Sequence, residues 1–299
     1  GKLAALQKAI FQPWDTLTYW LSAFSSFLWG WPLLIMLLGT HLYLTAILRF
    51  PQRYLLKALK LYFVKDHTDK GDISPFSSLM VALAANIGAG NIIGVGVAIA
   101  AGGPGAVFWC WLTGVLGMAT RYSEGLLAIK YRVENKDGNM SGGPMFVLER
   151  GLNSKWLGTA FDVFTAIAAF GIGNLTQGNA AAEQLHHAFS IPFWGTAAVL
   201  TALTALVMLG GIQGIARVCA FFVPFMAVIY IMGCLYILTV QAEYIIPAIR
   251  YILDCAFTGE AAAGGAAGAA VMAAMRTGVA RGLFSNEAGL GSAAIASAA

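Results

Sequence analysis

A glycine-rich break interrupts an apolar stretch of the chain. The run Asn86-Ile-Gly-Ala-Gly-Asn-Ile-Ile-Gly-Val-Gly96 has four glycines in eleven residues. Between Asp72 and Arg121 lie 48 residues without charge, long enough for two membrane crossings, and the break falls near the middle of the first crossing. Each glycine costs a helix interior roughly 1 kcal/mol relative to alanine, so local unwinding is expected. In lipid, unwound backbone survives only where protein or a water-filled cavity satisfies it. The break therefore predicts a transport site rather than a membrane anchor.

An unwound break offers backbone groups of two opposite kinds. The half-helix after it presents N–H groups to a carboxylate, and the half-helix before it presents carbonyls to a cation or an ammonium. One break can therefore bind both ends of an amino acid zwitterion. The predicted substrate-binding residues here are Gly88, Ala89, Gly90 and Asn91, with the amides of the last three as donors. The predicted cation-binding residues are Ala84, Ala85 and Asn86, with Na⁺ at Ala84 and Asn86.

A second polar break lies near the end of the chain, at Ser285-Asn-Glu-Ala-Gly-Leu-Gly291. We predict that Phe284, Ser285, Asn286 and Gly289 contact the substrate. Glu287 has two interpretations. It either lies near the cation or forms a structural ion pair with Arg281, Arg276 or Arg121, because buried carboxylates usually occur in pairs.

A third polar run, residues 171–179, lies in the apolar segment 157–181. Asn174 and Gln177 are three residues apart and share a helix face. Gln177 is predicted to form a hydrogen-bonding wall for the substrate. Interhelical hydrogen bonding explains Asn174 and Thr176 at least as well.

Two plainer interpretations compete with a transport site. Glycines at positions 88, 90, 94 and 96 could serve close helix packing, but helix contact does not need the flanking Asn86 and Asn91. A channel could line its filter with glycine carbonyls, yet no filter repeated on symmetric subunits is visible.

An intramembrane enzyme is a third alternative. It needs a nucleophile beside a base, and Ser285 with His186 or His187 is the one candidate pair in the sequence. Those histidines are expected in a solvated outer loop, at the wrong depth, so we predict that the chain is not an enzyme. His41, a lone histidine inside a span, is assigned no role.

The composition is that of an integral membrane protein. Charged residues make up 11% of the chain, against about 25% in ordinary soluble domains, the hydrophobic share is 59%, and the mean hydropathy is +0.72. The four cysteines are scattered without metal-ligand or redox spacing. Because Gly1 is not an initiator Met and Ala299 lies inside an apolar segment, the chain is expected to be part of a longer protein.

Seven segments meet the requirement of about twenty apolar residues for a bilayer crossing. They are residues 28–48, 75–101, 104–131, 157–181, 192–211, 217–240 and 270–299. The stretch 1–27 mixes charged and aromatic residues and is predicted to be an interfacial amphipathic segment. Residues 241–269 are predicted to form an outer loop.

Basic residues orient these segments. Twelve of the eighteen Lys and Arg residues fall in the first, third and fifth loops, which places the N-terminus outside and Ala299 near the inner face. Arg121 and Glu124, at the end of segment 104–131, are explained by snorkelling at the inner face and by an i,i+3 contact.

The two breaks fall near the middle of segments that run antiparallel, with four intact helices between them. Secondary transporters built from inverted repeats have broken helices at matching positions. Residues 28–48 are therefore predicted to be an extra transmembrane helix, residues 75–240 a first five-helix repeat, and residues 270–299 the first helix of a second, incomplete repeat.

Several motifs together resemble the alanine or glycine:cation symporter family, whose members include sodium:alanine symporters. The resemblance covers nearly the whole chain in order, and its last motif is long and specific. The motifs are Asn86-Ile-Gly-Ala-Gly-Asn-Ile-Ile-Gly-Val95, Ala101-Gly-Gly-Pro-Gly-Ala-Val-Phe-Trp109, Gly117-Met-Ala-Thr120, Ser141-Gly-Gly-Pro-Met145, Gly173-Asn174 with Gln177, and Arg281-Gly-Leu-Phe-Ser-Asn-Glu-Ala-Gly-Leu-Gly-Ser292. The chain departs from the family at Ala89, where a hydroxyl residue is usual.

The resemblance implies an all-α integral membrane protein with a LeuT-type inverted-repeat fold of the APC superfamily, here with about seven transmembrane helices, two of them discontinuous. It implies symport of alanine or glycine with Na⁺ by alternating access, across the inner (plasma) membrane of a bacterial or archaeal cell. H⁺ is the alternative coupling ion, and another cation-coupled small-solute carrier of the same fold is the alternative function. No organic cofactor, nucleic acid or obligate protein partner is expected.

Overall fold

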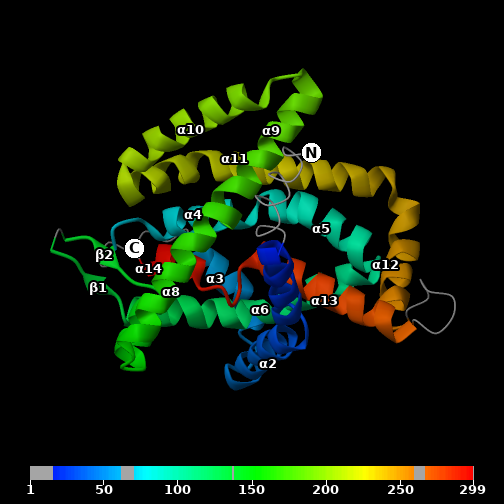
Figure 1. The fold of residues 1–299 in the computed structure, drawn as a ribbon, viewed down its shortest axis with the longest axis horizontal. Helices are drawn as coiled ribbons and strands as arrows, with labels where there is room; N and C mark the ends of the chain where they lie inside the picture. Colours follow the sequence, from blue (N-terminus) through cyan, green and yellow to red (C-terminus); the bar gives the residue numbers. More distant parts are fainter. Residues whose placement is uncertain (1–15, 62–70, 137, 259–266, 299) are drawn as a thin grey trace, which may run out of the picture.

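Helices make up nearly all of the chain that the structure describes. The computed structural model describes residues 16–61, 71–136, 138–258 and 267–298, so the predicted interfacial segment 1–27 is described only from residue 16 on. Helical turns at 16–28 precede α2. The other elements are α2 (Trp31–Ile47), η1 (Pro51–Tyr54), α3 (Leu55–Leu61), α4 (Pro75–Asn86), α5 (Ala89–Gly102), α6 (Gly105–Lys130), β1 (Val133–Glu134), β2 (Met140–Ser141), α7 (Pro144–Phe146), η2 (Val147–Gly151), α8 (Lys155–Ala168), η3 (Ala169–Leu175), α9 (Thr176–Phe189), α10 (Phe193–Leu209), α11 (Gly211–Val240), α12 (Ala242–Phe257), α13 (Ala267–Asn286) and α14 (Ser292–Ala298) (Figure 1).

Four helices in the described part are long and apolar enough to cross a membrane. They are Thr16–Ile47, Pro75–Gly102, Lys155–Phe189 and Gly211–Val240, and they contain most of the predicted segments 28–48, 75–101, 157–181 and 217–240. The predicted segment 192–211 is α10, an apolar helix of 17 residues. The predicted segments 104–131 and 270–299 form α6 and α13–α14, which are not among those four. These helices support a multi-pass membrane protein.

The first predicted break is present between α4 and α5. Ser74 caps α4 by accepting the Ser77 amide at 3.1 Å, and Pro75 occupies the first turn, where it needs no amide partner. The helix ends where Ile87 donates to the Leu83 carbonyl at 2.7 Å, and Gly88 follows in an extended conformation. The break thus lies at Ile87 and Gly88, slightly before the predicted centre, and Ala89 already belongs to α5.

The second predicted break is present between α13 and α14. Glu287, Gly289 and Gly291 all have positive φ angles, of 53°, 100° and 74°. Glycine adopts this left-handed region without the steric cost that other residues meet. Ser285 and Asn286 lie in the last turn of α13 rather than in the break itself.

The two broken helices run antiparallel along each other. A Cβ atom built on Gly102, at the end of α5, would lie 2.8 Å from Cβ of Thr277 in α13. At the opposite end, Ser78 Oγ of α4 donates to the Ala296 carbonyl of α14 at 3.5 Å. Residue numbers therefore rise along one broken helix as they fall along the other, as predicted.

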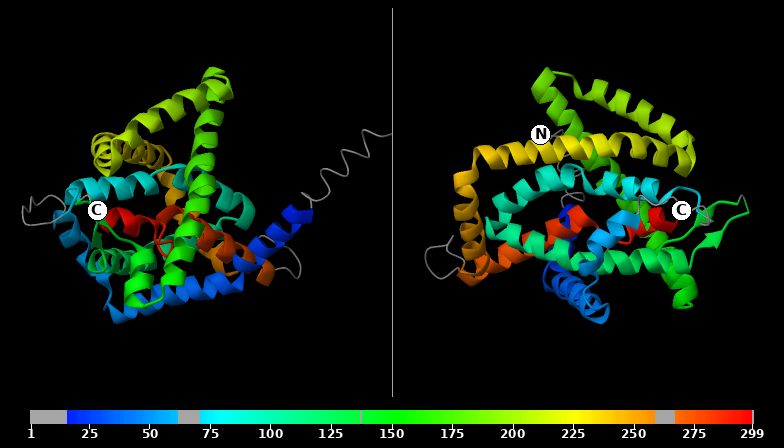
Figure 2. Two further views of the ribbon diagram at one scale, coloured as in Figure 1. Left: turned by 60° about the vertical axis from the view of Figure 1, so that its left-hand side comes forward. Right: turned by 180° about the vertical axis from the view of Figure 1, so that it is seen from behind.

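Helix α6 packs along both halves of the second broken helix. Cys110 Sγ donates to the Gly278 carbonyl at 3.0 Å near one end, and Gly117 faces Ala288 in the middle. The main buried cluster, where α2, α6 and α13 meet, consists of Leu34, Leu37, Trp109, Ala274, Val279 and Leu283. Figures 1 and 2 show α9 and α10 outside this bundle, with α11 against α4.

The segment predicted over 157–181 is longer than expected and irregular. Helices α8 and α9 are joined by π-helical turns at Ala169–Leu175, and helical structure continues to Phe189. The prediction of a loop at His186 and His187 is therefore wrong, since both lie exposed in the last turns of α9. The π-helical turns coincide with part of the polar run, and such turns are frequent at functional sites.

Residues 242–257 of the predicted outer loop 241–269 form a helix, α12. This helix descends from the end of α11 toward α13 (Figure 1). Gly105 permits the contact with α6, because a Cβ atom there would lie 2.6 Å from the carbonyl carbon of Cys255. The apolar residues of α12 are too few for a bilayer crossing but sufficient to cover α6.

Candidate functional site

The two breaks meet through their polar side chains. Ser285 Oγ, in the last turn of α13, donates a hydrogen bond to Asn91 Oδ1, in the first turn of α5. These residues are 194 positions apart in the sequence, and both were predicted to contact the substrate. The structure therefore brings the two predicted halves of the site together. The side chains of Ala89, Gly90 and Phe284 lie outside the described residues.

Several polar groups of the first break bind one another. The Asn86 carbonyl accepts the Gly88 amide at 3.1 Å and also the side-chain amide of Asn91. The Asn91 amide donates to the Gly88 carbonyl at 3.1 Å. Two groups predicted to be available to ligands, the Asn86 carbonyl and the Asn91 amide, therefore have partners within the chain. Helix geometry leaves the first-turn amides of Ala89 and Gly90 as the donors of α5.

One oxygen of the first break has no partner. Asn86 Oδ1 is shielded from solvent and accepts no hydrogen bond from the residues that the structure describes. It lies at the carbonyl end of α4, in the same turn as Ala84 and Ala85, where the helix dipole favours positive charge. Amide and carbonyl oxygens are suitable ligands for a hard cation. The predicted residues at this position therefore fit a sodium ion.

Gln177 of α9 reaches the first break. A Cβ atom on Gly88 would lie 3.4 Å from Gln177 Oε1 and 3.5 Å from its Nε2. Gln177 and Asn174 also line a cavity of about 840 Å³ between α9 and α10. The side-chain amide of Gln177 therefore lies directly beside Gly88 of the first break.

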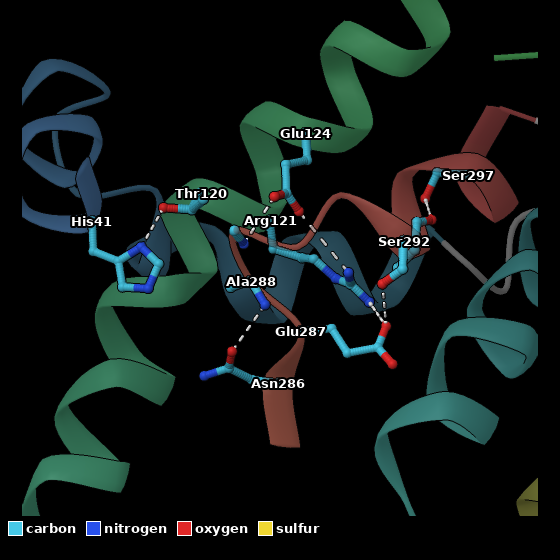
Figure 3. A network of polar contacts seen from close by, with 11 residues as sticks. His41, Thr120, Arg121, Glu124, Asn286, Glu287, Ala288, Ser292 and Ser297 are labelled. Atoms are coloured by element: carbon cyan, nitrogen blue, oxygen red, sulfur yellow. Dashed lines mark hydrogen bonds and ion pairs between the residues drawn. The ribbon is translucent and has the colours of Figure 1, made fainter. Parts of the chain in front are cut away.

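The second break is tied to α6 by charged residues (Figure 3). Glu124 Oε1 accepts the Gly289 amide at 2.8 Å, and Ser292 Oγ donates to Glu287 Oε2 at 2.8 Å. Arg121 lies between the two carboxylates, with nitrogen to oxygen distances of 4.0 Å to each. Gly289 was predicted to contact the substrate, and in the structure its amide is bound to Glu124.

Glu287 has the ion-pair partner that the second interpretation of the sequence allowed. That partner is Arg121, not Arg276 or Arg281, among the ion pairs of the described residues. The predicted i,i+3 contact of Arg121 with Glu124 is present at 4.0 Å. Sequence reasoning placed this pair at the inner face, allowed the contact of Arg121 with Glu287, and missed the contact of Glu124 with Gly289. The presence of Arg121 and Glu124 in the apolar segment 104–131 was the sequence signal for this contact.

Asn286 turns away from the first break and toward α6. Its Oδ1 accepts the Ala288 amide at 2.9 Å, and its Nδ2 lies 3.5 Å from the position of a Cβ atom on Gly117. His41, which sequence reasoning gave no role, is fully buried beside it, with Nδ1 2.6 Å from Thr120 Oγ1. Among the described residues, Ser285 forms its side-chain hydrogen bond with Asn91 and not with His186 or His187. His186 Nδ1 contacts the Ile191 carbonyl at 3.0 Å.

Comparison with known proteins decides the family. Residues 14–299 match the sodium:alanine symporter family. The chain belongs to this family. It is 51% identical over 282 residues to the sodium/alanine symporter AgcS of Methanococcus maripaludis, with 92% of this chain and 61% of that protein covered. It is 53% identical over 281 residues to an uncharacterised transporter of Haemophilus influenzae, with coverages of 93% and 62%.

A more distant member differs in its named substrate. The probable sodium/glutamine symporter GlnT of Bacillus subtilis is 36% identical over 273 residues, with 91% of this chain and 56% of that protein covered. The chain spans about three-fifths of the length of the H. influenzae and M. maripaludis relatives. These relatives are named as transporters or symporters and not as enzymes.

Proposed function

We propose that the whole protein carries a small neutral amino acid, alanine or glycine, across the membrane together with Na⁺. The observation that carries this proposal is the unpartnered Asn86 oxygen at the carbonyl end of α4, in a member of the sodium:alanine symporter family. The ion binds there with the carbonyls of Ala84 and Ala85. The substrate ammonium lies toward the same helix end, and its carboxylate binds the first-turn amides of α5.

The site is suited to a small substrate. Gln177 lies within 3.5 Å of the position that a side chain on Gly88 would occupy, so little room remains between α5 and α9. A hydrogen-bonding amide on one side and backbone amides on the other orient a zwitterion, while the short gap disfavours a large side chain. These features support alanine or glycine over a longer amino acid.

Transport follows alternating access in this proposal. The antiparallel contact of the broken helices, at Gly102 with Thr277 and at Ser78 with Ala296, supports a LeuT-type inverted-repeat fold in the whole protein. Rocking of one pair of half-helices against its neighbours opens the site first to one side and then to the other. The N-terminus lies outside, and the membrane is the inner (plasma) membrane of a bacterial or archaeal cell.

Uptake by the whole protein in proteoliposomes tests this function. We expect accumulation of labelled alanine or glycine that saturates with substrate and requires an inward Na⁺ gradient. Equal uptake with K⁺ replacing Na⁺, but dependence on a pH gradient, would assign H⁺ as the coupling ion. Flux that does not saturate would indicate a channel, and an unrelated transported solute would identify another cation-coupled carrier.

A further inference from the structure

Helix α2 lies directly against the second break. Leu37 and His41 are one helical turn apart on α2, and both are buried. A Cβ atom on Gly289 would lie 2.8 Å from Leu37 Cδ1, and one on Gly117 would lie 3.7 Å from His41 Nε2. A helix outside the predicted repeats therefore contacts the segment on which the site depends.

The two ring nitrogens of His41 are in different situations. Nδ1 lies 2.6 Å from Thr120 Oγ1 of α6, whereas Nε2 is buried without a hydrogen-bond partner in the described part of the chain. Buried polar atoms normally have partners. The neutral ring with its proton on Nδ1 donates to Thr120 and leaves Nε2 as an acceptor.

Asn286 provides the matching donor. Its Oδ1 already accepts the Ala288 amide at 2.9 Å, which directs Nδ2 to the other side of the amide group. Nδ2 lies 3.5 Å, and His41 Nε2 3.7 Å, from the same point, the position of a Cβ atom on Gly117. A donor and an acceptor therefore both lie next to Gly117, which has no side chain to separate them.

We propose that His41 is a positioning residue for the second break. One water molecule bridges the two side chains, accepting a hydrogen bond from Asn286 Nδ2 and donating one to His41 Nε2, while Nδ1 donates to Thr120. The bridge fixes the turn that follows α13 and therefore the placement of Ser285 against Asn91. This inference rests on the proposed function, because it assigns His41 an effect on substrate affinity without contact with substrate.

Matched variants of the whole protein test the transport effect. His41→Gln places an acceptor near the Nε2 position and His41→Asn near the Nδ1 position, so the pair separates the two bonds. We expect His41→Asn to raise KM for alanine about tenfold with kcat within about threefold, and His41→Gln to stay within about threefold of wild type in both. Tyr43→Phe, on the exposed side of α2, is the control and should match wild type.

A stability measurement tests the contact independently of transport. We expect the fall in melting temperature of the His41→Asn, Asn286→Ala double variant in detergent to be smaller than the sum of the single falls by about 2 °C or more, because the two changes remove one shared bond. Additive falls would overturn the proposal. So would equal KM values for His41→Asn and His41→Gln. Non-additive falls in a protein without sodium-dependent uptake would keep the contact and reject the proposed function instead.

Discussion

The two helix breaks touch each other, yet their polar groups serve different purposes. The first break contains no charged residue, keeps Gly88 in an extended conformation and leaves Asn86 Oδ1 without a partner. The second break has three positive φ angles and is bound to α6 through Glu124 and the Arg121–Glu287 ion pair. The first break therefore retains groups for a ligand, whereas the second uses its groups to hold its own shape.

This difference indicates how a pair of broken helices can move without unfolding. Unwound backbone in a membrane must be satisfied by protein or by a water-filled cavity. The second break meets that requirement with partners on α6. The first break leaves Asn86 Oδ1 without a partner among the described residues, so under the proposed function its geometry should respond to binding of the ion and the substrate.

Adding a side chain to a glycine of each break should separate the two roles most clearly. Gly289→Val combines a φ angle of 100° with a contact of 2.8 Å to Leu37, and we expect a loss of about 2–3 kcal/mol in the free energy of unfolding. Gly88 has a φ angle of −150°, which any residue adopts, so Gly88→Val should change stability by less than about 1 kcal/mol. It should instead reduce alanine uptake at least tenfold. Thermal unfolding and uptake assays measure both, and a severe loss of stability in Gly88→Val would contradict the comparison.

Removing the positive charge of Arg121, which lies on α6 beside the second break, should have the next largest effect. In Arg121→Gln, Glu124 and Glu287 lose their shared positive charge while remaining only 16% and 22% exposed. We expect a loss of about 2 kcal/mol in the free energy of unfolding, below the usual figure for fully buried pairs. Arg150→Gln, at an exposed position, is the matched control and should change stability by less than about 0.5 kcal/mol. Equal melting temperatures for the two variants would show that the ion pairs of Arg121 with Glu124 and Glu287 do not stabilise the break.

Removing the free oxygen of the first break should affect binding and not stability. We expect Asn86→Leu to weaken Na⁺ binding about tenfold, or about 1.4 kcal/mol, because a cation ligand is lost. The free energy of unfolding should stay the same or rise, since a buried unpartnered polar atom is also removed. Sodium titration of alanine uptake and thermal unfolding test the two parts. Unchanged sodium affinity would place the ion elsewhere.

The contact between the breaks should give the smallest effect. Ser285→Ala removes the hydrogen bond to Asn91, for which we expect a loss of about 1 kcal/mol or less in stability. Because the contact joins the binding residues of both breaks, KM for alanine should rise severalfold with little change in kcat. Ser190→Ala, at an exposed position after α9, provides a comparison that should leave KM unchanged.

Local sequence features predicted both breaks to within about two residues. Glycine disfavours helix in any context, and Gly289 and Gly291 adopt conformations that other residues avoid. The membrane class also follows from composition. Helix α12 was missed because its amphipathic pattern is shorter than a bilayer crossing, and its burial against Gly105 is a property of the folded chain.

The sequence by itself determined where the chain unwinds, because helix propensity and backbone sterics act within a few residues. Only the tertiary structure decided which polar groups remain free there. Three arginines were possible partners for Glu287, and packing of α6 selected Arg121. The same packing joined Asn91 to Ser285, placed the Asn286 side chain beside Gly117 and left Asn86 Oδ1 unpartnered. Such pairings depend on which helix faces come together, and residues more than a hundred positions apart carry no local signal of that contact.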